Sequence, residues 1–250
     1  HCNPEPHTSN KNLDEAILSD TSSFYYVDVK NYPVKNKKLP IGIFDSGIGG
    51  LTVMDAIVKY DGFNNQNKTL SSDGILDFEK ECFIYLADQA NMPYGNYSSL
   101  NKTDVLKEHI LKNLQFLLSN KYYQSSSDEE FKIDKSPVKA IVIACNTATA
   151  YGMEDIEAFL KKAKLDIKVI GVINAGVKGA FENLSNNENC SIGVMATEGT
   201  VLSNGYPNTI DKYHSDLNYK GEIKTFQQAG IGLAGAIDGV IDYINTQTTG

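Results

Sequence analysis

One cysteine in this sequence lies where a reactive thiol is expected. The apolar run Ile141-Val142-Ile143-Ala144 is typical of a short buried strand, and Cys145 ends it and opens the next helix. A thiol at a helix N-terminus can have a lowered pKa, and its thiolate is a base or a nucleophile. An isolated cysteine is more often a small buried apolar residue. The adjacent Asn146 and Thr147 favour the functional interpretation.

Small polar residues also follow the other predicted strands. Ligands of open parallel α/β sheets bind beyond the carboxyl ends of the strands, where helix N-termini present unpaired N–H groups. These ends carry the carboxylates Asp45, Asp88 and Glu198 among mostly uncharged residues: Ser46, Pro93-Tyr94-Gly95-Asn96, Asn146 to Thr149, Asn174 to Gly176 and Thr197 to Thr200. Such a set suits a small polar ligand that carries carboxylates and an amine.

Other kinds of site have little support. Gly47, Gly49 and Gly50 lack the GxGxxG spacing of a nucleotide-binding turn, and instead let the backbone turn sharply beneath a ligand. No GxSxG elbow of a serine hydrolase is present. The histidines and cysteines do not fall at ligand spacing, so we expect no metal. A Cys-His pair of Cys145 with His109 or His214 stays open, whereas Cys82 and Cys190 are not assigned to catalysis.

Short apolar strands alternate with helical segments along most of the chain, which predicts an α/β fold with parallel sheets covered on both faces. The expected strands are 41–44, 82–87, 140–144, 168–173, 192–196 and 222–226, and the expected helices are 51–60, 102–118, 153–163, 178–184, 201–213 and 233–244. The polar stretches 64–80 and 124–135 are expected to be surface insertions. We expect the strands before Asp166 and those after it to belong to two different domains. This predicts a first α/β domain at 39–166 and a second at 167–250, with the ligand cleft between them.

Composition excludes some partners. The 250 residues contain 23 Lys and Arg against 31 Asp and Glu, which gives a net charge of −8 at pH 7. A nucleic-acid binder carries a basic face, so we expect no nucleic-acid partner. No apolar run approaches the ~20 residues that span a bilayer, so we expect no membrane span.

The first 38 residues are polar and lack sustained periodicity, so we expect a tail or tether there. Cys2 at the start of a polar tether resembles the lipidated cysteine of a mature bacterial lipoprotein. A lipid anchor through Cys2 would place the protein in the cell envelope. The alternative is an incidental cysteine without a lipid.

Several motifs together resemble the glutamate racemases of the aspartate/glutamate racemase family. In chain order they are Ile41-Gly42-Ile43-Phe44-Asp45-Ser46-Gly47-Ile48-Gly49-Gly50-Leu51-Thr52-Val53, Tyr85-Leu86-Ala87-Asp88 with Pro93-Tyr94-Gly95-Asn96, Ala144-Cys145-Asn146-Thr147-Ala148, Gly171-Val172-Ile173, and Ile192-Gly193-Val194-Met195-Ala196-Thr197 with Gly199-Thr200-Val201. The resemblance extends from about residue 40 to about residue 228. It implies two α/β/α domains that enclose an amino acid.

The resemblance also implies an activity: a cofactor-independent racemase that interconverts L- and D-glutamate and supplies D-glutamate for peptidoglycan. Inversion at an α-carbon needs a base on one face, an acid on the other, and donors that hold the carboxylates. The resemblance makes Cys145 one of two catalytic thiols, with Asp45 and Ser46 orienting the substrate amine and the thiol. It puts Tyr94 and Gly95 in the pocket wall, and gives carboxylate binding to Asn146, Thr147 and Thr200. It further implies a cytoplasmic homodimer.

The sequence departs from the family pattern at the second thiol. The family carries it in a Gly-Cys-Thr-His motif, which is absent here, and Gly230 occupies a nearby position where a cysteine is common. We expect the natural chain to continue past Gly250 with that thiol. The alternatives are a one-thiol relative that binds an acidic amino acid or dicarboxylate without racemising it, and a one-thiol lyase or decarboxylase.

The sequence also departs from the family pattern in the part of the pocket wall that the second half of the chain is expected to form. Asn174-Ala175-Gly176 replaces the family's usual Glu-Pro-Gly. The choice between glutamate and aspartate depends on pocket depth and stays open.

Overall fold

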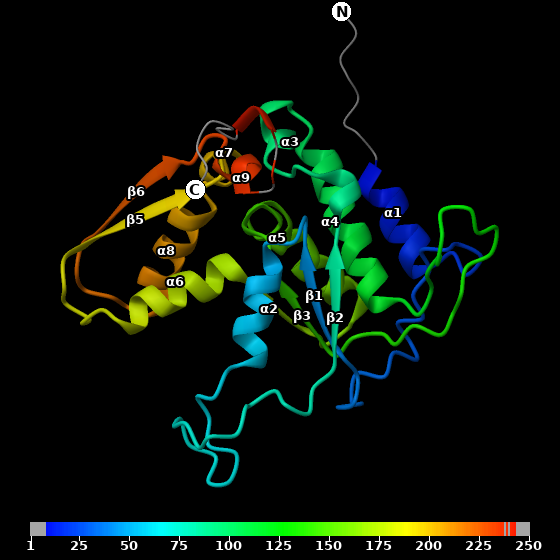
Figure 1. Cartoon of the computed structure of the whole chain (residues 1–250), viewed down its shortest axis with the longest axis horizontal. Helices are drawn as coiled ribbons and strands as arrows, with labels where there is room; N and C mark the ends of the chain where they lie inside the picture. Colours follow the sequence, from blue (N-terminus) through cyan, green and yellow to red (C-terminus); the bar gives the residue numbers. More distant parts are fainter. Residues whose placement is uncertain (1–8, 238, 240, 244–250) are drawn as a thin grey trace, which may run out of the picture.

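The computed structural model of this chain describes residues 9–237, 239 and 241–243, and contains two parallel sheets (Figure 1). The four-stranded sheet has the order β2-β1-β3-β4, with β1 at Ile41–Asp45, β2 at Phe83–Ala87, β3 at Ala140–Ile143 and β4 at Lys168–Gly171. The two-stranded sheet pairs β5 (Cys190–Ala196) with β6 (Ile223–Ala229). All of these pairings are parallel, so the predicted α/β class with parallel sheets is confirmed.

Helices follow nearly every strand. They are α1 (Ser9–Leu18), α2 (Gly50–Val58), α3 (Asn96–Ser99), α4 (Thr103–Leu118), α5 (Asn146–Ala163), α6 (Val172–Glu182), α7 (Glu198–Leu202), α8 (Gly205–Asp216) and α9 (Leu233–Ile237), with 3₁₀ turns at Gln89–Asn91 and Ile241–Tyr243. The single helix expected at 201–213 is two helices, because Asn204 adopts a left-handed conformation with φ of 53°. The end of the helix expected at 233–244 falls partly outside the described residues.

The core of the first sheet is built by α4 and α5. Buried residues of α4 recur at helical spacing, among them Leu106, Ile110 and Leu114, and they pack in one cluster with Ile156 of α5. Gly152 of α5 allows the close approach, because a Cβ there would lie 2.6 Å from Cγ2 of Ile110. Burial of each such side chain contributes about 1.5–3 kcal/mol. This packing fixes α5, and with it the residue at its N-terminus.

The strand at residue 168 belongs to the first sheet, not to the second half as expected. β4 pairs in parallel with β3, with Ala140 opposite Lys168. After β3 the chain runs through α5, whose C-cap residue Lys164 is left-handed, and this β3-α5-β4 connection places β4 beside β3. The change of sheet therefore comes after Gly171, and the division into two domains at residue 166 stays a prediction.

The expected N-terminal tail is largely wrong. Leu13 and Ile17 of α1, together with Val27 and Tyr32, are buried in the core cluster of the first sheet. The Tyr32 hydroxyl donates to the carbonyl oxygen of Val138 at 2.7 Å, and burial raises the pKa of this phenol. Residues 13–38 therefore form part of the folded unit. Cys2 and the rest of residues 1–8 lie outside the described residues.

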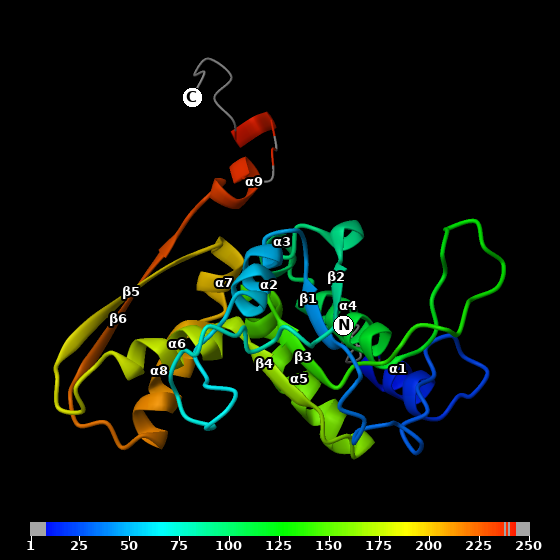
Figure 2. The same cartoon turned by 60° about the horizontal axis from the view of Figure 1, so that its bottom comes forward.

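The second sheet is covered on one face. Helices α6 and α8 lie beside β5 and β6 (Figure 2). Ile192 of β5 and Ile223 of β6 pack against a smaller cluster that includes Val177 of α6 and Ile210 of α8. The opposite face carries exposed side chains, with Met195 67% and Phe226 62% accessible. Among the described helices, none is both long and apolar enough to cross a membrane.

The packing of α1 gives a stability prediction. Ile17→Ala removes a side chain with 0% exposure and should lower the free energy of unfolding by about 2–5 kcal/mol, through lost burial and the cavity left behind. Urea unfolding followed by circular dichroism measures this loss. Glu15→Ala, at an exposed position of the same helix, is the matched control. Equal, small effects of the two substitutions would contradict the packing of α1 on the core.

Candidate active site

The thiol of Cys145 lies at the junction of β3 and α5. Cys145 is the N-cap residue of α5, with extended backbone angles, and its Sγ accepts the backbone N–H of Ala148 at 3.4 Å. The hydroxyl oxygen of Ser46 lies 3.4 Å from the same Sγ, and the Cys145 side chain is buried. The structure therefore brings together Cys145 and Ser46 from neighbouring strand ends, as the sequence pattern predicts.

The carboxylate of Asp45 fixes the glycine-rich turn beside this thiol. Its Oδ1 accepts the N–H of Ser46 at 2.8 Å, and its Oδ2 accepts the N–H of Gly50 at 2.7 Å. The Tyr85 hydroxyl donates to the carbonyl oxygen of Gly47 at 3.0 Å and lies 3.5 Å from Oδ2 of Asp45. A Cβ at Gly50 would lie 2.8 Å from Cβ of Ala144, so the turn needs glycine there. One buried side chain thus holds both ends of the turn and places Ser46 against the thiol.

The net effect on the thiol differs from the expectation. Burial, followed by the negative charge of Asp45, raises the pKa of Cys145, whereas the hydrogen bonds from Ser46 and Ala148 lower it and contribute less. The expected lowering of the pKa considered only the helix N-terminus, which favours the thiolate. Burial removes water from around the thiolate and raises the pKa. In this structure the surroundings of Cys145 favour the protonated thiol.

The threonines predicted to bind carboxylate meet between α5 and α7. The hydroxyl oxygens of Thr147 and Thr200 lie 3.1 Å apart, and Thr197 lies at the same 3.1 Å from Thr200. Thr197 also caps α7 by accepting the N–H of Thr200. Asn146 is exposed, and its Oδ1 accepts the Tyr206 hydroxyl at 2.8 Å. Residues of the second half therefore contact the first turn of α5 directly.

Tyr94 and Gly95 take different positions. The ring of Tyr94 is buried in the core, and its hydroxyl donates to Asp88, which also accepts a 2.9 Å hydrogen bond from Nδ2 of Asn113. Burial and Asp88 raise the pKa of Tyr94, which keeps the phenol protonated. Gly95 lies against α7, because a Cβ at Gly199 would come within 2.7 Å of its carbonyl oxygen. Tyr94 supports this loop from beneath, and its assignment to the pocket wall stays a prediction.

Asn113 and Tyr206 were missed by sequence reasoning. Asn113 is a buried polar residue on the inner face of α4, and a polar residue within that helix's apolar face is the signal that could have found it. Tyr206 stands in a helix whose sequence carries no sign of the contact with Asn146.

Cys82, Cys190, His109 and His214 make their contacts away from the Cys145 thiol. Cys82 comes just before β2 and Cys190 is the first residue of β5, whereas Cys145 follows the end of β3. His109 packs edge-on against Tyr97, and His214 bonds the carbonyl oxygen of Gly221. Within the described ranges, no three His, Cys, Asp or Glu residues are grouped so as to hold a metal ion.

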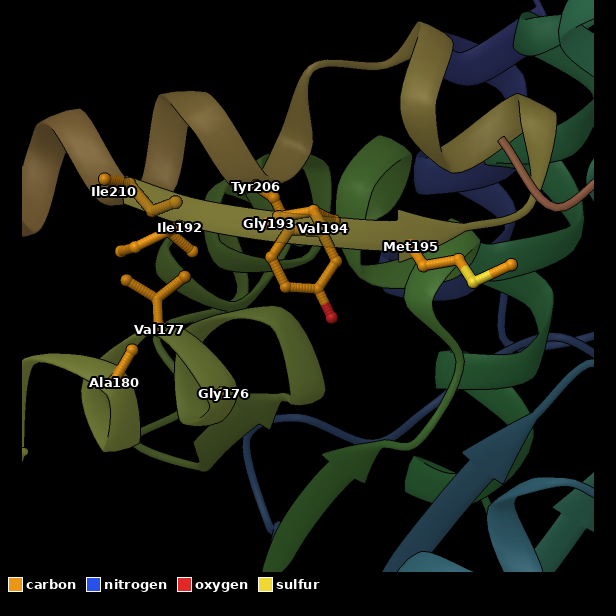
Figure 3. A pocket seen from close by; sticks show the side chains of 9 residues that line it. All are labelled: Gly176, Val177, Ala180, Ile192, Gly193, Val194, Met195, Tyr206 and Ile210. Atoms are coloured by element: carbon orange, nitrogen blue, oxygen red, sulfur yellow. The ribbon is translucent and has the colours of Figure 1, made fainter. Parts of the chain in front are cut away.

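An open groove of about 310 Å³ lies between β5, α6 and α8, beside this site rather than at the thiol. It is lined by Gly176, Val177, Ala180, Ile192 to Met195, Tyr206 and Ile210 (Figure 3). Tyr206 belongs both to the groove wall and to the contact with Asn146.

Comparison with known proteins identifies relatives of one kind. The chain is 33% identical over 181 residues to the glutamate racemase of Oceanobacillus iheyensis, covering 72% of this chain and 50% of that protein. It is 34% identical over 179 residues to the enzyme of Sulfurihydrogenibium sp., covering 72% and 52%, and 31% identical over 212 residues to that of Persephonella marina, covering 84% and 62%. The chain thus spans about half the length of the first two curated relatives.

The comparisons with family models and with solved structures add no further support. No protein-family model matches the chain. The crystal structure of glutamate racemase from Campylobacter jejuni subsp. jejuni aligns with a TM-score of 0.47 at 24% identity, over 83% of this chain and 69% of that chain. By sequence, this chain belongs to the glutamate racemase family.

Proposed function

We propose that the protein containing this chain is a cofactor-independent glutamate racemase that supplies D-glutamate for peptidoglycan synthesis. The observation that carries the proposal is the buried Cys145 thiol, 3.4 Å from the Ser46 hydroxyl and next to the Asp45 carboxylate that holds the Ser46 turn. The glutamate racemases to which the chain is similar support this assignment.

Cys145 is the group that exchanges a proton with the α-carbon. Burial and Asp45 raise its pKa, which favours the protonated thiol. The ammonium group of a bound amino acid near Asp45 would offset the carboxylate charge and favour the thiolate, which is the base that the reaction needs.

The substrate carboxylate has a favourable position at the N-terminus of α5. This 18-residue helix begins at Asn146, directly after the thiol, and presents unpaired N–H groups at that end. The side chains of Asn146 and Thr147 add further donors. Donors at the carboxylate stabilise the negative charge that develops when the α-proton leaves.

Inversion also needs an acid on the opposite face of the α-carbon. Cys82 comes just before β2 and Cys190 begins β5, so neither lies at the carboxyl end of a strand, where Cys145 lies. We therefore assign to Cys145 the half-reaction in which it exchanges the α-proton of one enantiomer, and full racemisation needs a second acid. A one-thiol relative that binds an acidic amino acid or dicarboxylate without turnover, or a one-thiol lyase or decarboxylase, is the competing function.

Location and assembly follow from the resemblance alone. We propose a cytoplasmic enzyme with glutamate as its substrate. The homodimer stays a prediction. A lipid anchor at Cys2 also stays a prediction, because Cys2 lies outside the described residues.

Isotope exchange tests the half-reaction. The chain is incubated with L-glutamate or D-glutamate in D₂O, and the α-proton signal and the optical rotation are followed together. Loss of the α-proton signal is expected for at least one enantiomer. Cys145→Ser should lower this rate by about 10²–10⁴-fold, because the hydroxyl is a far weaker base. Cys190→Ser, at the start of β5, is the matched control and should exchange normally.

Two outcomes of the exchange experiment decide against the proposal. Undiminished exchange by a folded Cys145→Ser variant would show that another group is the base. If the folded parent chain exchanges neither enantiomer, the binding-only relative replaces the racemase. Release of CO₂ from an arylmalonate-type acid would instead identify the decarboxylase.

The hydrogen bond from Ser46 gives a pH prediction. It lowers the pKa of Cys145, so Ser46→Ala should raise that pKa further and move the pH profile of thiol alkylation upward. Below the midpoint, alkylation by iodoacetamide should slow by roughly 2- to 10-fold, as expected for one lost hydrogen bond. The measurement uses a background in which Cys2, Cys82 and Cys190 are serine. Ser99→Ala, at an exposed position of α3, is the control, and a profile for Ser46→Ala that moves downward would refute the assignment.

A further inference from the structure

Tyr206 links the second half of the molecule to the Cys145 site. It is the second residue of α8, and its hydroxyl donates to Oδ1 of Asn146 at 2.8 Å. Asn146 directly follows Cys145 and is the first residue of α5. The hydrogen bond therefore joins residues 60 positions apart, at the end of α5 where the substrate carboxylate is expected.

The fold holds the Tyr206 backbone firmly against α5. Asn204 turns the chain between α7 and α8 in a left-handed conformation, and Gly205 follows. A Cβ at Gly205 would lie 2.9 Å from Cβ of Ala150 and 3.2 Å from Cδ1 of Ile173, so glycine lets the start of α8 approach α5. The direction of Tyr206 is thus set by close packing of two helices.

The Tyr206 side chain has an apolar part and a polar end. Its ring packs against the cluster that contains Val177 and Ile210 and lines the groove shown in Figure 3. Burial raises the pKa of Tyr206, which keeps the hydroxyl protonated and able to donate. The ring is held by packing while the hydroxyl reaches Asn146.

An asparagine side chain can bind a carboxylate with its Nδ2 but not with its Oδ1. The two ends have nearly the same shape, so the amide can flip unless a neighbour distinguishes them. A hydroxyl can also accept from Nδ2, but the Tyr206 hydroxyl donates to Oδ1 in this structure and leaves Nδ2 directed elsewhere. In the described part of the chain, Nδ2 of Asn146 makes no hydrogen bond to protein and is available to a ligand.

We propose that Tyr206 is a positioning residue that fixes the Asn146 amide so that its Nδ2 donates to the substrate carboxylate. This inference rests on the proposed function of the Cys145 site and deepens it. Tyr206 does not touch the reacting atoms, and it acts on substrate binding through Asn146. A displacement of α8 would change the donor offered beside the thiol.

The test is a double-mutant cycle read by protection of Cys145. In the background with Cys145 as the one remaining cysteine, iodoacetamide alkylation is measured at increasing concentrations of glutamate. Tyr206→Phe should raise the half-protecting glutamate concentration about 3- to 10-fold, because one orienting hydrogen bond is lost. The alkylation rate without glutamate should not change. Tyr213→Phe removes a hydroxyl from the same helix, where the ring packs on Phe181, and should leave both quantities unchanged.

Asn146→Ala supplies the second arm of the cycle. It should raise the half-protecting concentration as well, and Tyr206→Phe should add little in that background, because its target is already gone. Equal protection of the parent and Tyr206→Phe would overturn the inference and leave the proposed function standing. Full additivity with Asn146→Ala would overturn it too, as would a changed alkylation rate without glutamate. Failure of glutamate to protect the parent would overturn the proposed function, and this inference with it.

Discussion

The buried carboxylate of Asp45 is the interaction on which the site depends. It stands at the end of β1 and accepts the N–H groups of Ser46 and Gly50, so it holds the turn between them in one shape. A buried carboxylate without such partners would be costly, and the turn supplies them. The same carboxylate lies beside Cys145 and, after burial, is the second cause of its raised pKa. Asp45 therefore both holds the shape of the turn and raises the pKa of the Cys145 thiol.

The sheet brings the reacting groups together because parallel strands end at one edge. β1 and β3 are neighbours, so Ser46 meets Cys145 although the two residues are 99 positions apart. From the other side, α7 and α8 bring Thr200 to Thr147 and Tyr206 to Asn146. The N-terminus of α5 is thus contacted by both parts of the described molecule. The binding of a ligand there would depend on the position of α8 as well as on that of the Asp45 turn.

The sequence predicts what depends on local pattern and misses what depends on packing. The alternation of strands and helices identifies the α/β class, and the polar run after residues 141–144 identifies Cys145 as the residue at a strand end. The burial of Leu13 and Ile17 could not be predicted with the same certainty, since two apolar residues four apart in a polar segment become informative only once a surface to cover is known. The raised pKa of Cys145 likewise depends on how much water the folded chain removes.

The pKa of Cys145 with and without the charge of Asp45 tests the account most directly. It is obtained from the pH dependence of thiolate absorbance in the chain whose other cysteines are serine, for the parent and for Asp45→Asn. A lower pKa is expected in Asp45→Asn, because the negative charge that opposes the thiolate is gone while burial remains. A pKa that stays the same or rises in a folded Asp45→Asn variant would contradict the coupling of Asp45 to the thiol.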